Sequence, residues 1–414
     1  MSQIGPAQGY RRGDRDYVRA LAALFAYGLA TFAMIYVVQP NFVLIGADLD
    51  RNASQTSLLL SATTLALAVV VVPVARLSAR LGRARTMGFG LLLAVAGGLG
   101  VAWADDFTVL LALRAVQGIG FAGVTGCALA WVAEEIHHAD VPRVGGLYIA
   151  GTTLGGMLGR LLGGGAAELG GWRFSIVVVT VVCAALTVFG MVTLPRPAVP
   201  AQRSAGTSGT TRPPPTRDDA LVGLDAPNRG NRFRLYLVAG AGMAAFVGIF
   251  TAIVFRAAAP PYLLGPGITS LFFLTYLAGT VTSSQAGRVV ARLGVRRTAL
   301  LGLAGCAVGV LVTLATPAWA IWCGLLIMSA GFFLTHAVAG STAPRLTSRP
   351  AAASGRYTLA YYVGSSLGGV LIGAAWDVGG WLLCVAGALA AYAVAALAAA
   401  GVRPVGPARA PGTP

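Results

Sequence analysis

The stretch Arg76-Leu-Ser-Ala-Arg80-Leu-Gly82 returns, 212 residues later, as Arg288-Val-Val-Ala-Arg292-Leu-Gly294. Two further matches keep nearly the same offset, and chance rarely produces three matches in register. They are Gly151-Thr-Thr-Leu-Gly155-Gly156-Met-Leu with Gly364-Ser-Ser-Leu-Gly368-Gly369-Val-Leu, and Gly170-Gly171-Trp172 with Gly379-Gly380-Trp381. Self-similarity at a fixed spacing indicates a duplicated structural unit. We therefore expect two halves with the same fold.

Long apolar runs separate these repeated stretches. Only 11% of the 414 residues are charged and 56% are hydrophobic, whereas about a quarter of the residues of a soluble protein are charged. A transmembrane helix needs about 20 apolar residues, and the runs with few or no charges supply twelve such spans. Helices satisfy their own backbone in lipid, and the runs lack the alternation of barrel strands. We predict an all-α membrane protein with twelve transmembrane helices in two pseudo-symmetric six-helix bundles.

One polar stretch divides the chain into its two halves. It is rich in Ser, Thr, Gly, Pro and charge, a composition that cannot bury a core and is typical of a flexible linker. The predicted organisation is a cytoplasmic N-terminal tail at 1–16, an N-terminal bundle at 17–194, a cytoplasmic linker at 195–232, a C-terminal bundle at 233–402 and a cytoplasmic C-terminal tail at 403–414.

The distribution of arginine predicts the orientation in the membrane. The chain has 30 basic residues, all arginine, against 14 acidic ones, and its formal net charge is +16. The arginines form short clusters between apolar runs, which argues against a nucleic-acid partner. With twelve spans, the clusters fall on one side, and positive residues favour the cytoplasmic side. We predict a multi-pass protein of a bacterial inner membrane with both termini in the cytoplasm.

The sequence offers little for metal, cofactor or disulfide chemistry. The five cysteines are isolated inside apolar runs and are expected to be small buried side chains. Glu134-Glu-Ile-His137-His138 has poor spacing for a metal site on one helix face and fits a solvated helix end better. The chain also lacks a Ser/His/Asp set, an HExxH motif and a phosphate loop. We expect no metal, no cofactor and no enzymatic activity.

Three motifs of the first half match family patterns. They are Ala75-Arg-Leu-Ser-Ala-Arg80-Leu-Gly82-Arg83-Ala-Arg85, Leu110-Leu-Ala-Leu-Arg114-Ala-Val-Gln117-Gly118-Ile-Gly120, and Gly151-x-x-x-Gly155-Gly156-x-x-Gly159. On these motifs the chain resembles the major facilitator superfamily over essentially its whole length. The last two are similar to motifs of its drug:proton antiporters, and the run from Gly146 to Arg160 resembles the acriflavine-sensitivity branch of bacterial exporters. The resemblance implies two bundles that rock around a solute site at their interface.

The resemblance also implies roles for the repeated turns and glycines. The family's acidic residue in the cytoplasmic turn is replaced by Ala79 here, so the family's latch between the halves must be weaker or built differently. Gly156 replaces the usual proline of the glycine motif, and Arg160 replaces its last glycine. The implied gating residues are Arg76, Arg80, Gly82, Arg83, Arg292 and Gly294. Small residues four apart permit close helix contact, and those expected to pack helices are Gly151, Gly155, Gly156, Gly159, Gly364, Gly368 and Gly369.

Arg114 is a charge in the middle of the fourth span, where it costs roughly 2.5–3.5 kcal/mol on the insertion scale. It has no twin in the second half, where Leu325 stands at the equivalent position. Helical spacing puts Gln117, Phe121 and Thr125 on its face, and we expect this face to line a central cavity. The resemblance links Arg114 to proton coupling. The alternative is a structural arginine bonded to carbonyls of the first span.

Two further residues are candidates for coupling or anion binding. Arg160 lies deep in the fifth span, where it could bind an anionic substrate or pair with Glu168. None of the 14 acidic residues lies within a span, so His336 is the titratable candidate away from the membrane faces. Histidine exchanges protons near neutral pH, which suits coupling. The alternative for His336 is a hydrogen-bonded helix residue.

Aromatic and hydroxyl side chains recur on single helix faces. Such surfaces suit an amphipathic organic solute, although the same side chains could simply pack helices together. The candidates, with His336, are Tyr27, Thr31, Phe246, Phe250, Phe332 and Tyr361.

These observations predict a secondary transporter that moves a small organic solute by rocker-switch alternating access. Proton-coupled efflux of an amphipathic compound or drug is the first interpretation. The alternative is an uncoupled facilitator or importer of a small anionic metabolite, which the lack of a buried carboxylate favours. The expected partners are the solute, the lipid bilayer and protons, and the expected oligomeric state is a monomer.

Overall fold

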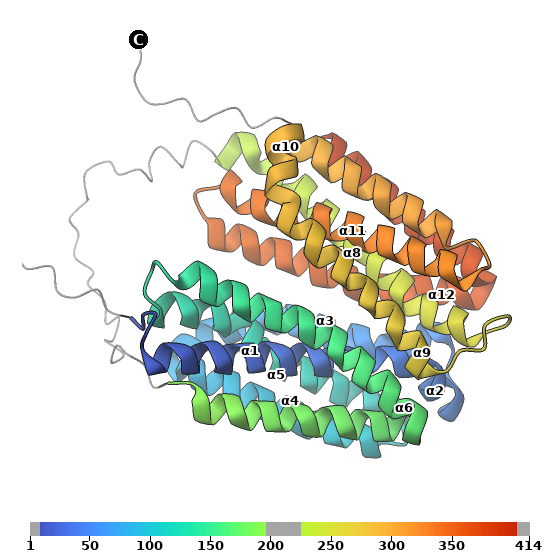
Figure 1. Ribbon diagram of the computed structural model, residues 1–414, viewed down its shortest axis with the longest axis horizontal. Helices are drawn as coiled ribbons and strands as arrows, with labels where there is room; N and C mark the ends of the chain where they lie inside the picture. The colour runs from blue at the N-terminus through green and yellow to red at the C-terminus, as the bar shows by residue number, and fades with distance from the viewer. Residues whose placement is uncertain (1–8, 196–224, 404–414) are drawn as a thin grey trace, which may run out of the picture. The chain divides into compact units, whose positions relative to one another are not determined.

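The computed structural model describes residues 9–195 and 225–403 (Figure 1). Across these two ranges the regular elements are helices, and nine helical stretches are long and apolar enough to cross a membrane. The elements are α1 (Arg15–Tyr36), η1 (Gln39–Asn41), α2 (Phe42–Asp48), α3 (Ala53–Leu81), α4 (Arg83–Trp103), α5 (Phe107–Glu135), α6 (Val141–Thr193), α8 (Asp225–Ala258), α9 (Pro266–Leu271), η2 (Phe272–Thr275), α10 (Tyr276–Val312), α11 (Ala318–Thr342), η3 (Ala343–Leu346) and α12 (Pro350–Ala400).

Three of the long helices contain a sharp break at glycine. The break lies at Gly170 and Gly171 in α6, at Gly294 in α10, and at Gly379 and Gly380 in α12. Each break divides one helix into two spans, so nine continuous stretches contain twelve spans. Positive φ angles at Gly171, Gly294 and Gly380 make each break possible, because side chains disfavour that region. The predicted twelve-helix fold is confirmed.

The breaks also show the duplication at the level of the backbone. Gly171 has φ 75° and ψ −177°, and its counterpart Gly380 has φ 59° and ψ −150°. Gly82, between α3 and α4, has φ 94° and ψ 125°, and its counterpart Gly294 has φ 76° and ψ 166°. The repeated sequence stretches therefore encode the same chain reversals in both halves.

Large apolar side chains cover the outside of the helices. Leu169 is 84% exposed, Val378 83% and Trp103 80%. Exposed apolar surface on this scale is unfavourable in water and fits contact with lipid. Cys323 also lies exposed, on α11, whereas the other four cysteines are buried. The expectation that all five cysteines are buried was wrong for Cys323, because an apolar run predicts lipid contact as readily as a core position.

The contacts divide the chain into two compact units within α8 and again at the start of α10. Of the described residues, unit 1 contains 9–195 and 250–274, and unit 2 contains 225–249 and 275–403. Residues 250–274, expected in the C-terminal bundle, thus belong to unit 1. The reason is local packing: Ser270 approaches Gly164 so closely that a Cβ on the glycine would lie 2.5 Å from the serine Cβ.

Residues 225–232, expected in the flexible linker, form the first turns of α8. The Asn231 Nδ2 donates to the Arg403 carbonyl at 3.2 Å, and the Asn231 Oδ1 accepts from the Arg403 amide at 3.0 Å. The rest of the linker and parts of both tails lie outside the described residues, at 196–224, 1–8 and 404–414.

Glycine contacts build the same helix pair in each unit. In unit 1, a Cβ at Gly155 of α6 would lie 2.3 Å from the Leu29 oxygen of α1. In unit 2, a Cβ at Gly368 of α12 would lie 2.1 Å from the Ala244 oxygen of α8. Gly151, Gly159 and Gly364 meet backbone at 2.7 Å or less in the same way, and Gly369 is buried. A Cβ at Gly156 would instead lie 3.4 Å from the ring of Tyr36.

Candidate functional site

Arg114 of α5 lies fully inside unit 1, with 1% of its surface exposed. Its Nε donates to the Leu59 carbonyl at 3.1 Å, and its two terminal nitrogens donate to the Met34 carbonyl at 3.0 Å and the Ile35 carbonyl at 2.7 Å. A fourth hydrogen bond reaches the Gln117 Oε1 at 2.7 Å. Four of the five guanidinium N–H groups therefore have acceptors.

The position of these acceptors explains why a cation is needed there. Met34 and Ile35 lie in the last turn of α1, and Pro40 follows the helix end. Carbonyls in a last helical turn lack helical N–H partners and carry the negative end of the helix dipole. The Arg114 guanidinium supplies both the missing donors and a compensating charge. Its contacts match the structural alternative raised by the sequence.

The rest of the predicted Arg114 face is also enclosed. Gln117 accepts from Arg114 and donates through Nε2 to the Ala94 carbonyl of α4 at 2.9 Å. Gln117 and Phe121 are 2% and 0% exposed. The Thr125 hydroxyl, which is partly buried, donates to the Phe121 carbonyl at 3.1 Å. Arg114 and Gln117 thus form one hydrogen-bond network, whereas the Thr125 hydroxyl bonds a carbonyl of its own helix.

Arg160 of α6 contacts the same broken region of the first span. Its Nε donates to the Gln39 Oε1 at 2.8 Å and its Nη1 to the Gly156 carbonyl at 2.8 Å. The guanidinium carbon lies 3.8 Å from the ring centre of Tyr36 and 4.5 Å from that of Phe273. Aromatic faces stabilise a desolvated cation, so Arg160 is held between two rings.

Gln39 extends this contact to a residue of α8. Its Nε2 donates to the Thr251 hydroxyl at 3.2 Å. Glu168, the predicted alternative partner of Arg160, accepts a hydrogen bond from the Gly267 amide at 3.0 Å. Both arginines thus hold the segment that joins α1 to α2. We call Arg114, Gln117, Arg160 and Gln39 the arginine brace.

Unit 2 contains a group of aromatic side chains around a histidine. His336 of α11 has its Nδ1 2.9 Å from the Tyr357 hydroxyl, which also donates to the His336 carbonyl at 3.2 Å. The imidazole lies parallel to the Phe332 ring at 5.8 Å, and the Tyr361 ring lies 4.8 Å away. Phe246 of α8 stacks on Phe332 at 4.0 Å. We call these five residues the histidine–aromatic cluster.

The cluster and its neighbours come from α8, α10, α11 and α12. The ring of Phe246 also lies 5.2 Å from that of Tyr276 of α10 and 5.7 Å from that of Phe333 of α11.

The Tyr357 hydroxyl has one hydrogen to share between two contacts of His336. When the hydroxyl donates to the His336 carbonyl, the imidazole Nδ1 must donate to the hydroxyl oxygen. When Nδ1 carries no hydrogen, the hydroxyl donates to Nδ1 instead. The Tyr357 hydroxyl can therefore follow a change in the protonation of His336.

The remaining predicted solute-contacting side chains also have protein neighbours. Phe246 and Phe250 lie one turn apart on α8, but their rings stack on different partners, Phe246 on Phe332 and Phe250 on Phe273 at 5.4 Å. Tyr27 is packed so closely that a Cβ at Gly190 would lie 2.3 Å from its ring, and the Thr31 hydroxyl donates to the Tyr27 carbonyl at 2.7 Å.

Among the predicted gating residues of the first half, Arg83 forms an ion pair. Arg83 forms two parallel hydrogen bonds to Glu134 at the end of α5, with its Nε 2.6 Å and its Nη2 2.5 Å from the two carboxylate oxygens. Gly82 and Gly294 form the two equivalent turns with positive φ. Arg76, Arg80 and Arg292 have exposed surfaces.

Sequence reasoning missed three participants. Gln39 precedes Pro40, and that proline was the available signal that the first span is interrupted. Tyr357 lies one helical turn before Tyr361, which predicts the same face. Glu134 is the partner of Arg83, but nothing in the spacing of the two residues predicts that contact.

Comparison with known proteins agrees with this architecture. A family model described as Major Facilitator Superfamily matches residues 23–256. The chain is 33% identical over 383 residues to the inner membrane transport protein YnfM of Escherichia coli, covering 91% of this chain and 88% of that protein. It is 31% identical over 375 residues to the uncharacterized MFS-type transporter YybF of Bacillus subtilis, covering 90% of each chain.

A solved structure shows the same fold at low identity. A crystal structure of a mutant nucleoside transporter NupG matches with a TM-score of 0.70 and 11% identity, covering 92% of this chain and 98% of that one. The chain has twelve spans in two repeated halves and apolar surfaces suited to lipid, and its relatives are named as transporters. These findings agree. The chain belongs to the Major Facilitator Superfamily and is a multi-pass secondary transporter.

Proposed function

We propose that the protein exports an amphipathic organic compound from a bacterial cell in exchange for protons, by rocker-switch alternating access in the inner membrane. The observation that carries the proposal is the histidine–aromatic cluster of unit 2. It combines an imidazole, a side chain that can take up and release a proton, with several aromatic faces. We infer that His336 carries the coupling proton and that the surrounding rings accept the apolar part of the solute.

The arginine brace has a different role in this proposal. Arg114 already uses four of its N–H groups on protein acceptors, and Arg160 is held between two rings. We infer that both arginines keep unit 1 rigid while the units move. Both termini are proposed to be cytoplasmic, and the protein is proposed to work as a monomer.

The second candidate is an uncoupled facilitator or importer of a small anion. It is favoured by the absence of any acidic residue within the predicted spans, because proton-coupled carriers commonly use a buried carboxylate. In that case Arg114 and Arg160 would exchange some of their protein acceptors for the anion. The two candidates differ in whether a pH gradient drives transport.

The test uses the full chain in proteoliposomes loaded with ethidium as an amphipathic probe. Dye transport is measured with and without an imposed pH gradient for the wild type, His336→Phe and Tyr361→Phe. We expect the gradient to accelerate transport by the wild type and by Tyr361→Phe, which keeps its ring. His336→Phe should lose the acceleration and retain passive dye exchange. Equal transport with and without the gradient in the wild type would contradict antiport.

A further inference from the structure

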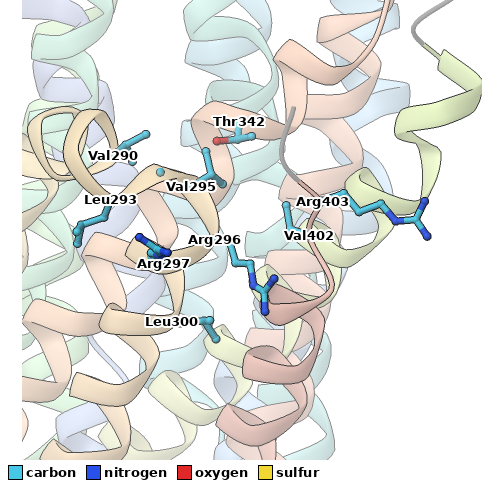
Figure 2. Close-up of a pocket in the computed structure, with 10 residues that line it drawn as sticks. Val290, Leu293, Val295, Arg296, Arg297, Leu300, Thr342, Val402 and Arg403 are labelled. Atoms are coloured by element: carbon cyan, nitrogen blue, oxygen red, sulfur yellow. The ribbon is translucent and has the colours of Figure 1, made fainter. Parts of the chain in front are cut away.

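We propose that unit 2 contains a binding site for a phosphate-bearing anion, separate from the solute path, where α10 breaks at Gly294. A pocket of about 700 Å³ lies between this break, the end of α11 and the end of α12 (Figure 2). Ligand pockets are commonly about 300–1,000 Å³. The volume therefore suffices for a phosphate group with a substantial organic substituent.

The polar side of the pocket is strongly basic. Among the residues that the structure describes, its lining includes Arg296, Arg297 and Arg403 and no acidic side chain. Figure 2 shows Arg296 reaching into the space between α10 and the end of α12, whereas the guanidinium of Arg403 points away from the other two. Planar guanidinium groups bind phosphate oxygens through paired hydrogen bonds. Arg296 and Arg297 are therefore the expected contacts of the anion, with Arg403 at the rim.

The rest of the lining is aliphatic. Five of the lining residues are Val or Leu, among them Leu293, Leu300 and Val402. An inorganic ion needs no such surface, but a phospholipid offers both a phosphate and an acyl chain. The arginine pattern also predicts that this end of the helices faces the cytoplasm, where anionic lipids attract basic side chains by about 1 kcal/mol each. The lining thus favours an anionic phospholipid as the source of the phosphate.

The equivalent turn of unit 1 shows why the site belongs to unit 2. There Arg83 is neutralised by its two hydrogen bonds to Glu134. Its counterpart at the repeat offset is Val295. Arg296 stands where unit 1 has Ala84, whereas Arg297 corresponds to Arg85. One repeat therefore closes its turn with an internal ion pair, and the other presents its charge to a pocket.

The test is a binding titration of the full-length protein in a neutral detergent, followed by thermal shift. The probes are phosphatidylglycerol, phosphatidylcholine and inorganic phosphate. The variant is Arg296→Ala with Arg297→Ala. The matched control is Arg288→Ala with Arg292→Ala, which removes the same charge from the same turn without touching the pocket lining. All four arginines are exposed, so both variants should fold.

We expect phosphatidylglycerol to stabilise the wild type and the control with equal affinity. The pocket variant should bind about thirtyfold more weakly, since each lost arginine near an anionic headgroup removes about a fivefold attraction. If inorganic phosphate alone reproduces the stabilisation and the lipid adds nothing, the free ion is the source and the site stands. Equal weakening in the two double variants, or no response of the wild type to either anion, would overturn the proposal.

Discussion

The two units share a scaffold and differ in what their cores contain. In unit 1, Arg114 and Arg160 are each 1% exposed and hold the break after α1. In unit 2, Leu325 is fully buried at the position equivalent to Arg114, and stacked rings surround His336. The same glycine contacts join the helices in both units. The duplicated fold therefore fixes the helix packing, and the core residues determine what each unit can do.

Arg114→Leu gives unit 1 the residue of unit 2 and should cause the largest loss. Three backbone carbonyls and Gln117 would lose their donor, and each unsatisfied buried group costs about 1–3 kcal/mol. We expect the free energy of unfolding in detergent to fall by roughly 4 kcal/mol. The free energy of unfolding of Arg114→Lys should lie between those of the wild type and Arg114→Leu, because lysine has three donors and lacks the planar guanidinium. Wild-type stability of Arg114→Leu would mean that the brace is not structural.

Arg160→Leu should have a smaller effect. It removes two hydrogen bonds and the stacking on Tyr36 and Phe273, and a desolvated cation on an aromatic face contributes about 2 kcal/mol. A double-mutant cycle with Gln39→Leu measures the coupling of the pair by chemical unfolding. The two substitutions should be non-additive, since each removes the partner of the other. Additive losses would show that the contact between Arg160 and Gln39 contributes nothing.

Gly155→Ala and Gly368→Ala test the shared scaffold. Each new methyl group would meet backbone at little more than 2 Å, at Leu29 and Ala244 respectively. Overpacking of a tight contact typically costs about 1–3 kcal/mol. We expect similar falls in melting temperature for the two variants, whatever the chemistry of the neighbouring core. A loss confined to one variant would show that the glycine contacts are not equivalent.

Arg83→Ala should have the smallest effect on stability. The Glu134 side chain is 51% exposed, and ion pairs at exposed positions contribute about 1 kcal/mol or less. The coupling energy from a cycle with Glu134→Ala should fall as salt concentration rises, because exposed charges are screened. A coupling energy of several kcal/mol that ignores salt would contradict this interpretation.

Periodicity and spacing were sufficient for the fold and insufficient for the contacts. Apolar run lengths predicted twelve spans, and the repeated Gly170-Gly171-Trp172 marked a break that both halves contain. The interruption after α1 was missed, because Pro40 stands in a long run without charged residues. A buried charge identified Arg114 as unusual, but its acceptors are backbone carbonyls, which no sequence pattern marks.

The histidine–aromatic cluster shows the same limit. Helical spacing placed Phe332 and His336 on one face of α11. The contact between His336 and Tyr357 depends on how α11 and α12 rotate against each other, which packing decides. Phe246 and Phe250 share a face of α8 by the same spacing, yet Phe246 stacks on Phe332 and Phe250 on Phe273, because different elements pack against the two turns. Spacing along one helix predicts a face, and the neighbouring helices decide what the face contacts.

The proposal assigns proton coupling to His336 of unit 2 and a structural role to the arginines of unit 1. Measuring the proton movement that accompanies solute transport tests this assignment most directly. Proteoliposomes containing a pH-sensitive dye would report proton flux on addition of the transported compound, for the wild type and His336→Phe. The account predicts proton flux with the wild type, and solute exchange without proton flux with His336→Phe. Undiminished solute-driven proton flux with His336→Phe would contradict the assignment of coupling to unit 2.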